Sequence, residues 1–207
     1  MIEQENNIQN IKDIYNNLAR WYDFLVKPLE FFLLRKKRRE FVASLSGRIL
    51  EVGIGTGANL QYYRDDVLLT GIDASSEMLK VAKHKAEKYG VEADFREMDA
   101  ENLKFPNDYF DSVISTLTLC TVPHPIQVVR EMARVCKKGG RLIFLEHGRS
   151  NIGLVSRLQM KRSEKHFRKH GCRLLSEPSD IIASAGLNIK TSRRFFFGIF
   201  QQIETTT

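Results

Sequence analysis

The feature that most constrains this chain is a short apolar run, Ile49–Val52, that passes directly into glycines at alternate positions, Gly53, Gly55 and Gly57. Glycines placed just after a strand let the backbone turn sharply and approach a bound nucleotide closely. A phosphate-binding P-loop would need Gly-Lys-Ser/Thr next, and a dinucleotide fold would need the spacing GxGxxG; the sequence has neither. Glu51, inside the run, adds a carboxylate close to the glycines. The segment therefore predicts a buried strand that leads into a nucleoside site.

Short β-rich runs alternate with amphipathic stretches from Arg48 to about Gly148. We expect strands over 48–52, 67–72, 93–98, 110–115 and 141–146, and helices near 57–63, 75–89 and 125–136. Strands and helices that alternate with short connections indicate right-handed βαβ units. The middle of the chain is therefore predicted to form a parallel sheet covered by helices on both faces.

The two ends of the chain differ from this pattern. In residues 1–46 apolar side chains recur at spacings of three and four, which indicates helices, with Pro28 ending the first and starting the second. In the tail we expect a basic helix over Leu154–Lys169, a short second helix, and two strands joined by a turn at Gly198. The chain therefore divides into an N-terminal helical cap, residues 1–46, and one α/β domain, residues 47–207.

Acidic residues close the second and third expected strands. Asp73 and Ala74 follow the second strand, and Asp99, Ala100 and Glu101 follow the third. A carboxylate at the tip of a parallel strand can accept hydrogen bonds from ribose hydroxyls, and a second one could accept from an adenine amino group. Asp73 and Asp99 could instead be helix N-caps, and that alternative stays open for either residue alone. Acids in register with the glycines favour a cationic nucleoside over a pyrophosphate.

Taken in order, these motifs resemble those of the class I S-adenosylmethionine-dependent methyltransferases. The resembling segments are 51–57, 71–79, 99–106, 110–115 and 131–140, within a resemblance that covers about Tyr15–Glu146. The resemblance implies an α/β, three-layer Rossmann-like fold with a mostly parallel seven-stranded sheet, a C-terminal antiparallel hairpin and added N-terminal helices. It also implies S-adenosyl-L-methionine as the cofactor.

The same resemblance implies roles for individual residues. The expected cofactor-binding residues are Glu51, Gly53, Gly55, Gly57, Asp73, Ala74, Met78, Asp99, Ala100 and Glu101. In the family pattern the glycines surround the methionine moiety, Asp73 binds the ribose, and Asp99 with the Ala100 amide binds the adenine. Met78 would pack against the adenine ring, although a Met at helical spacing is also typical of a plain core.

Methyl transfer from a sulfonium is an in-line displacement, so positioning and desolvation can supply most of the acceleration and no metal is required. The candidate catalytic residues are Tyr15, Tyr22 and His147. Both tyrosines lie in a segment that resembles the N-terminal aromatic helix of methyltransferases acting on quinones and phospholipids. They could equally be core contacts of an amphipathic helix. His147 follows the fifth expected strand, where it could be a base or a capped loop residue.

The distribution of charged residues along the chain indicates which kinds of partner it could bind. The formal net charge is +7, and Arg35–Arg39 forms a basic band. Between Arg157 and Arg173 there are seven Lys or Arg residues and one acid, Glu164. Such a run is either a solvated helix face or a surface for anionic lipid. The sequence has no nucleic-acid-binding module, and Ser115–Thr118 departs from the Asp/Asn-Pro-Pro-aromatic motif of base methylation, so nucleic acid is disfavoured.

The cysteines and the first 20 residues indicate the cellular compartment in which the protein is expected. Cys120, Cys136 and Cys172 lie far apart and form no CxxC pair, which argues against a disulfide framework and a structural zinc site. Residues 1–20 have the wrong chemistry for a signal peptide, and no apolar run reaches the roughly 20 residues of a membrane span. We therefore expect a cytoplasmic protein, peripheral at the inner membrane face if it binds lipid.

Three later segments, 119–125, 144–150 and 170–173, resemble a narrower branch of the family. That branch contains bacterial phosphatidylethanolamine N-methyltransferases and the lipid-associated methyltransferase-like proteins of animals. The resemblance implies a phospholipid amine as methyl acceptor, with a small thiol or a quinone-ring carbon as alternatives. From other classes, an rRNA methyltransferase and a non-catalytic cofactor-binding protein are the remaining alternatives.

Overall fold

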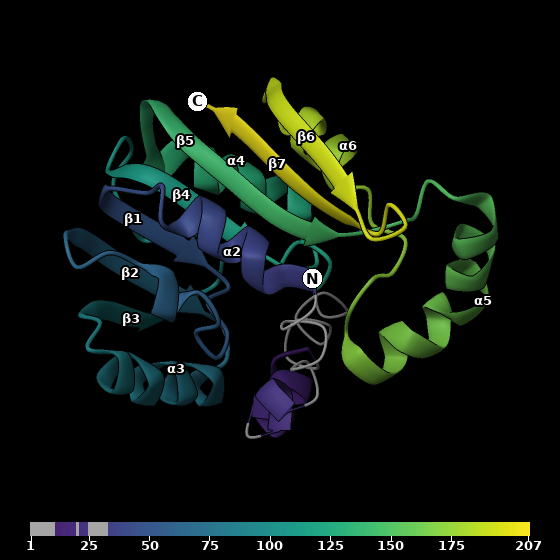
Figure 1. The fold of residues 1–207 in the computed structure, drawn as a ribbon, viewed down its shortest axis with the longest axis horizontal. Coiled ribbons are helices and arrows are strands. Elements are labelled where there is room, and N and C mark those ends of the chain that lie inside the picture. Colours follow the sequence, from purple (N-terminus) through teal and green to yellow (C-terminus); the bar gives the residue numbers. More distant parts are fainter. Residues whose placement is uncertain (1–10, 20, 25–32) are drawn as a thin grey trace.

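The computed structural model describes residues 11–19, 21–24 and 33–207, and its described strands form one seven-stranded sheet (Figure 1). The strands are β1 (Gly47–Val52), β2 (Val67–Asp73), β3 (Ala93–Glu97), β4 (Phe110–Thr116), β5 (Cys136–His147), β6 (Ile189–Phe195) and β7 (Phe200–Thr206). Their order is β3-β2-β1-β4-β5-β7-β6, with β1 to β5 parallel and β7 antiparallel to both of its neighbours. The expected parallel sheet with a C-terminal hairpin is confirmed.

Helices α2 (Arg35–Val42), α3 (Ser76–Tyr89), α4 (Pro125–Val135) and α6 (Pro178–Ser184) flank this sheet. The remaining labelled helix, α5 (Gly153–His170), lies beside the sheet and not over either face (Figure 1). The helix expected near 57–63 is wrong: only a 3-10 turn, Leu60–Tyr62, forms there, because Gly55 and Gly57 have left-handed φ angles of 56° and 77°. Residues 11–19 and 21–24 are helical, while the break expected at Pro28 lies outside the described residues.

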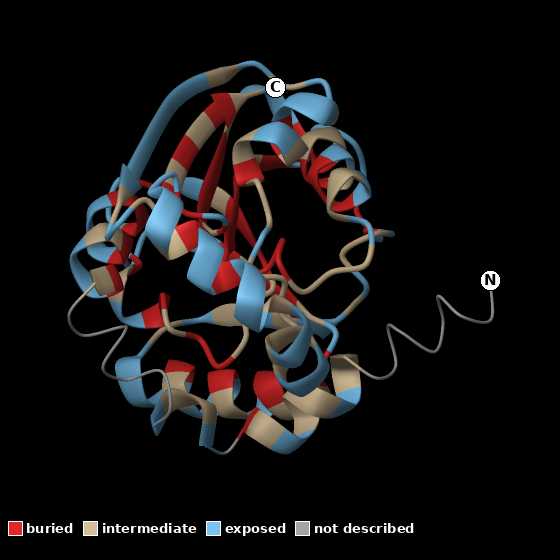
Figure 2. Cartoon of the chain, turned by 90° about the vertical axis from the view of Figure 1, so that its right-hand side faces the viewer, coloured by how far each residue is buried: buried red, intermediate tan, exposed pale blue. Residues whose placement is uncertain are grey.

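The hydrophobic core lies on both faces of the sheet. Ile49 joins Phe41 of α2 and Ala82 of α3 on one face, whereas Leu50 joins Met132 of α4 on the other. Adjacent residues of β1 therefore enter opposite cores, as the side-chain alternation of a strand requires. Figure 2 shows the buried residues along the strands and the inner helix faces, with exposed residues outside.

This topology fixes where a ligand can bind. β1 lies between β2 and β4, so the chain runs to opposite sides of β1 in the two halves of the sheet. Ligands of open α/β sheets bind at such a switch point, at the carboxyl ends of the strands. The glycine loop follows β1, Asp73 ends β2 and Asp99 follows β3, so all three lie at that edge. Among the described helices, none is long and apolar enough to cross a membrane.

Candidate active site

A pocket of about 740 Å³ opens at the carboxyl ends of the central strands. This volume is within the range of about 300–1,000 Å³ that is typical of small-molecule sites. The predicted site residues that line it are Tyr15, Tyr22, Gly53, Gly55, Asp73, Ala74, Met78, Asp99 and Ala100. The structure thus brings the tips of three strands and the N-terminal helix around one cavity.

The glycine loop is held by Asp73. The backbone amide of Gly55 donates to Asp73 Oδ2 at 2.9 Å, and the amide of Ser75 donates to Oδ1 at 2.8 Å. Burial raises the pKa of Asp73 against the lowering effect of these two hydrogen bonds. Gly53 has a φ of 68°, and a Cβ on it would lie 2.2 Å from Thr118 Oγ1, so a side chain there does not fit.

The helical residues 11–19 and 21–24 are tied to the sheet edge by polar contacts. Ser75 Oγ donates to Asn16 Oδ1 at 2.6 Å, next to the start of α3. Thr56 Oγ1 donates to Asp23 Oδ1 at 2.6 Å, and Lys85 Nζ pairs with Asp23 Oδ2 at 2.5 Å. The described part of this helix therefore closes one side of the pocket by contacts to both the glycine loop and α3.

The two predicted catalytic tyrosines lie together in the pocket wall. The ring centroids of Tyr15 and Tyr22 are 6.3 Å apart, and the rings are tilted by 55°. Burial raises the pKa of Tyr15 far above its usual value, and the nearby Cys120, Tyr22, Cys172 and Asp73 add to the rise. The Tyr15 hydroxyl therefore stays protonated at neutral pH, which suits a hydrogen-bond donor and does not suit a base.

Glu51 lies behind the loop, apart from the described lining of the pocket. Its carboxylate accepts from Asn59 Nδ2 at 2.6 Å and from the Tyr63 hydroxyl at 2.8 Å. Burial raises the pKa of Glu51 to about 7, although hydrogen bonds from Tyr63 and Asn59 and the charge of Arg38 lower it. The geometry favours a supporting position for Glu51 beneath the glycine loop.

Arg38 is buried, although it belongs to the basic band Arg35–Arg39. It is 3% exposed, and its Nη1 atom donates to Asn59 Oδ1 at 3.0 Å and to Thr116 Oγ1 at 2.9 Å. Leu34 and Val42, one helical turn away on each side, are also buried, so Arg38 lies on the inner face of α2. Only the outer part of the band can meet a surface partner.

Two more predicted cofactor residues lie outside the described lining of the pocket. Glu101 accepts from the backbone amide of His124 at 2.9 Å and contacts its Nδ1 atom at 2.7 Å, just before α4 begins. Gly57 has a φ of 77°, and a Cβ there would lie 2.3 Å from Leu60 Cδ1. Both residues shape the loops that carry the lining residues.

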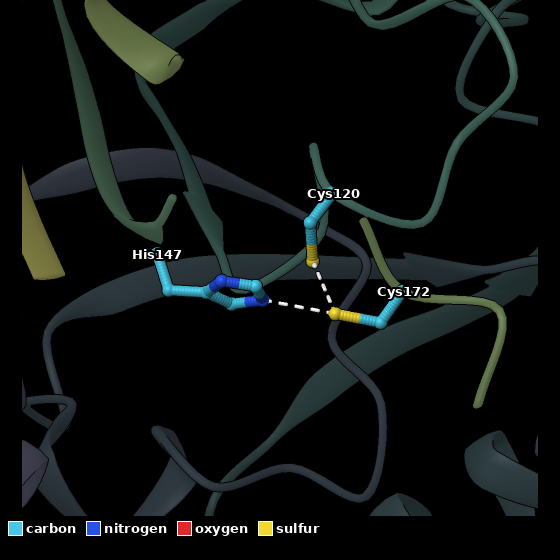
Figure 3. A group of neighbouring side chains, drawn as sticks. All are labelled: Cys120, His147 and Cys172. Atoms are coloured by element: carbon cyan, nitrogen blue, oxygen red, sulfur yellow. Dashed lines mark hydrogen bonds between the residues drawn. The ribbon is translucent and has the colours of Figure 1, made fainter. Parts of the chain in front are cut away.

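His147 contacts Cys172 and lies in a group with Cys120, a grouping that the sequence analysis missed (Figure 3). Its Nε2 atom lies 2.9 Å from Cys172 Sγ, which in turn lies 3.5 Å from Cys120 Sγ. The hydrogen bond with Cys120 lowers the pKa of the Cys172 thiol; burial opposes this, and the hydrogen bonds with His147 and His166 reinforce it. Burial lowers the pKa of His147, but the hydrogen bond and charge of Cys172 outweigh burial and raise it. His147 is therefore a partner of Cys172, which neither expected role described.

Comparison with known proteins identifies the fold and chemistry. A family model described as "Methyltransferase domain" matches residues 50–144. The ubiquinone/menaquinone biosynthesis C-methyltransferase UbiE of Geotalea daltonii is 33% identical over 160 residues, which cover 72% of this chain and 68% of that protein. The chain belongs to the class I S-adenosylmethionine-dependent methyltransferases.

Other relatives of this methyltransferase differ in what they share with it. The phosphatidylethanolamine N-methyltransferase of Cereibacter sphaeroides is 45% identical over 115 residues, 55% of this chain and 57% of that protein, so the match spans little more than half of the relative. An S-adenosylmethionine-dependent methyltransferase structure from Thermotoga maritima has a TM-score of 0.70 and 25% identity, with 95% of this chain and 99% of the other covered. One from Aquifex aeolicus, with a TM-score of 0.66, 17% identity and coverage of 92% and 97%, shows the fold alone.

S-adenosylmethionine is the methyl donor of this methyltransferase, and the pocket fits a molecule of that kind. Asp73 and Asp99 place carboxyl groups in the lining, where hydroxyl or amino groups of a nucleoside could donate to them. A Cβ on Gly55 would find no atom within 4 Å, which leaves open space beside the loop. When bound, the cofactor supplies an activated methyl group for in-line displacement.

Proposed function

We propose that this methyltransferase N-methylates the amine of a phospholipid headgroup at a membrane surface. The observation that carries the proposal is the outward face of α5, which combines exposed leucines with a dense row of cations. The 45% identity to a phosphatidylethanolamine N-methyltransferase, over about half of each chain, supports the same acceptor class.

The proposed cofactor contacts follow the lining of the pocket. Asp73 would accept from the ribose hydroxyls, and Asp99 would accept from the adenine amino group beside the Ala100 amide. Gly53 and Gly55 would leave room for the methionine moiety, since side chains there would either clash or enter the pocket. The remaining predicted binders, Glu51, Gly57, Glu101, Ala74 and Met78, would hold the loops or pack beside the nucleoside.

The acceptor amine must present a lone pair to the methyl group. An amine resembling a lysine side chain is mostly protonated at neutral pH, with a pKa of about 10. A partly apolar pocket penalises the charged form and raises the fraction of neutral amine. The rings of Tyr15 and Tyr22 would hold the amine in line, and the protonated Tyr15 hydroxyl would donate to a headgroup oxygen.

The α5 face has the composition of an interfacial helix. Leu154 and Leu158, 78% and 48% exposed, are one turn apart at its start. The exposed basic residues continue from them along the same face at helical spacing: Arg157, Lys161, Arg162, Lys165, Arg168 and Lys169. The opposite face carries the buried Ser156 and Gln159, and Gln159 Nε2 donates to the Gly148 carbonyl at 2.9 Å. Each basic residue near an anionic surface contributes about 1 kcal/mol to binding.

A second exposed apolar element adjoins the start of α5. The turn between β6 and β7 exposes Phe196 and Phe197, and Ser150 Oγ donates to the Phe197 carbonyl at 2.5 Å, just before Ile152 and Leu154. At the other end of α5, Gly171 lies close to Ile11, which lines the pocket: a Cβ added to Gly171 would be 3.4 Å from Ile11 Cγ1. A membrane docked on α5 would therefore lie beside the N-terminal helix that borders the site.

The test combines vesicle flotation with methyl transfer from labelled cofactor to phosphatidylethanolamine in vesicles that also contain anionic lipid. The double variant Leu154→Ser/Leu158→Ser and the charge reversals Lys161→Glu/Lys165→Glu should each reduce both flotation and transfer at least about tenfold. Leu68→Ser, an equally exposed leucine on β2, and Lys83→Glu/Lys88→Glu on α3 are the matched controls and should change neither. If the α5 variants and the controls behave alike, the membrane-surface proposal is wrong.

Methylation of a quinone-ring carbon is the second candidate. It is favoured by the match to UbiE, which covers 72% of this chain and includes more of the molecule than the match to the lipid enzyme. A carbon acceptor needs no neutral amine, so its rate should not follow the titration of an amine. Transfer to a quinone precursor without any transfer to lipid would select this candidate.

A further inference from the structure

One cluster of reactive side chains has no part in the proposed methyl transfer. Cys120 lies in the loop after β4, His147 ends β5, and Cys172 follows α5. Figure 3 shows the three side chains pointing toward one another, and their donor atoms all lie within 4.8 Å of one another. The backbone amide of Arg173 donates to the Cys120 carbonyl at 2.9 Å and fixes the two cysteine segments side by side.

The donors are those of a zinc site. Two cysteine sulfurs and one imidazole nitrogen form a Cys₂His set, which zinc enzymes use with a fourth position left for water or substrate. Magnesium and calcium prefer oxygen ligands, and the cluster offers no carboxylate. Zinc is borderline soft and takes both sulfur and imidazole.

The distances suit a metal after a small movement. With Zn–S near 2.3 Å and Zn–N near 2.0–2.1 Å, a tetrahedral site separates two sulfur ligands by about 3.8 Å and a sulfur from a nitrogen by about 3.5 Å. The Cys120–Cys172 sulfur separation of 3.5 Å is about 0.3 Å shorter than this. The separation of 2.9 Å between Cys172 and His147 must open by about 0.6 Å, which side-chain rotation can provide.

We propose that Cys120, His147 and Cys172 bind one Zn²⁺ ion, with a water molecule in the fourth position. This reverses the expectation drawn from the spacing of the cysteines, since the order of the strands joins residues that are distant in sequence. His166 also lies beside Cys172, but its donor atoms are not among those within 4.8 Å, so we assign it no ligand role.

The position of the site suggests what the ion does. It would join the loop after β4, the end of β5 and the chain that leaves α5, close to Tyr15 and the wall of the pocket. The ion would stabilise the position of α5 against the loop after β4 and the end of β5.

The test uses the full chain after reduction and removal of metal with a chelator. Titration with ZnCl₂, followed by metal analysis of the desalted protein, should give about one Zn²⁺ per chain. CoCl₂ should produce thiolate-to-cobalt charge-transfer absorption, which reports sulfur ligands directly. Zinc should also slow the alkylation of Cys172 by at least about tenfold, as measured by peptide mass spectrometry.

Variants separate this site from adventitious binding. Cys172→Ala and His147→Asn, at partly buried positions, should weaken zinc binding at least about tenfold, since even residues behind the ligands are worth 10- to 100-fold. Cys136→Ala removes a buried cysteine outside the cluster and should bind like the wild type. Should a variant fail to fold, the wild-type stoichiometry and alkylation still decide the question. The proposal would be overturned if the wild-type protein takes up no zinc. It would also be overturned if Cys136→Ala weakens zinc binding as much as Cys172→Ala does.

Discussion

The carboxylate of Asp73, at the end of β2, accepts a hydrogen bond from the backbone amide of Gly55 at 2.9 Å. This contact ties the second strand to the glycine loop that follows the first. Asp73 also accepts from the amide of Ser75, so one side chain orders both walls of the pocket before any ligand enters. A preformed site of this kind lowers the ordering cost of binding.

Asp73→Ala should weaken the binding of S-adenosylhomocysteine, the product form of the cofactor, about 10- to 100-fold, because hydrogen bonds to charged groups contribute about 1.5–3 kcal/mol. Isothermal titration calorimetry measures the change, and circular dichroism checks the fold. Asp94→Ala, an exposed aspartate of β3 outside the pocket lining, is the matched control and should bind normally. Normal affinity in Asp73→Ala would remove this residue from the site.

Comparing Gly55→Ala with Gly90→Ala should separate two effects of an added side chain: backbone strain, which lowers the unfolding free energy, and obstruction of the pocket, which lowers cofactor affinity. Gly55 and Gly90 both have left-handed φ angles, 56° and 68°, and a Cβ at either position meets no atom within 4 Å. Both alanine variants should therefore lose about 1 kcal/mol of unfolding free energy. Only Gly55 lines the pocket, so only Gly55→Ala should also lose cofactor affinity. Equal affinities in the two variants would show that the loop does not touch the ligand.

Asp23→Ala should loosen the N-terminal helix from the body of the enzyme. The substitution removes both the hydrogen bond from Thr56 and the ion pair with Lys85. In this ion pair the Asp23 side chain is 44% exposed and the Lys85 side chain is 21% exposed. The unfolding free energy should change by less than about 1 kcal/mol, as is usual for partly exposed pairs. Cofactor dissociation, followed by stopped-flow fluorescence, should be several-fold faster. Asp66→Ala, which breaks the exposed pair with Arg64, should leave dissociation unchanged.

The stability of the enzyme should fall as the pH rises through about 7. Burial raises the pKa of Glu51 from 4.5 to about 7, so the fold favours the protonated carboxyl. The contribution of this group to the unfolding free energy is full below pH 4.5 and is lost as the pH passes the folded-state pKa, by up to about 3 kcal/mol. Burial raises the pKa of Glu146 to about 7 as well, so Glu51→Gln should remove only the Glu51 share of this dependence in urea unfolding series, while Glu92→Gln on the surface should remove none of it. A slope in Glu51→Gln equal to that of the wild type would assign the titration to another group.

The alternating pattern of the sequence predicted the positions of the five parallel strands to within a residue or two at most ends, except that β5 begins at Cys136 rather than near Arg141. Buried parallel strands have strong local patterns, and the glycine loop marks the end of β1. The two strands of the tail and their turn at Gly198 were also predicted from the sequence. Their place as an antiparallel hairpin in a seven-stranded sheet came from the resemblance to the family, because periodicity alone does not give the order of strands.

Contacts between distant segments were the part that the sequence did not predict. Cys120 and Cys172 are 52 residues apart, and they meet only because β4 and β5 are neighbours and α5 returns to their ends. The sequence places Arg38 in the basic band Arg35–Arg39, where its residue type does not by itself set it apart from its neighbours. Its helical spacing from Leu34 and Val42 held the signal that it faces inward.

The most direct test of the account is the identity of the methylated product. The wild-type enzyme is given labelled S-adenosylmethionine and a panel of phosphatidylethanolamine vesicles, a quinone precursor and a small thiol, and the labelled molecules are identified by mass spectrometry. We predict label on the headgroup amine of the lipid, at a rate that rises with pH as the neutral amine becomes more abundant. Label on the quinone or the thiol, with none on the lipid, would contradict the account.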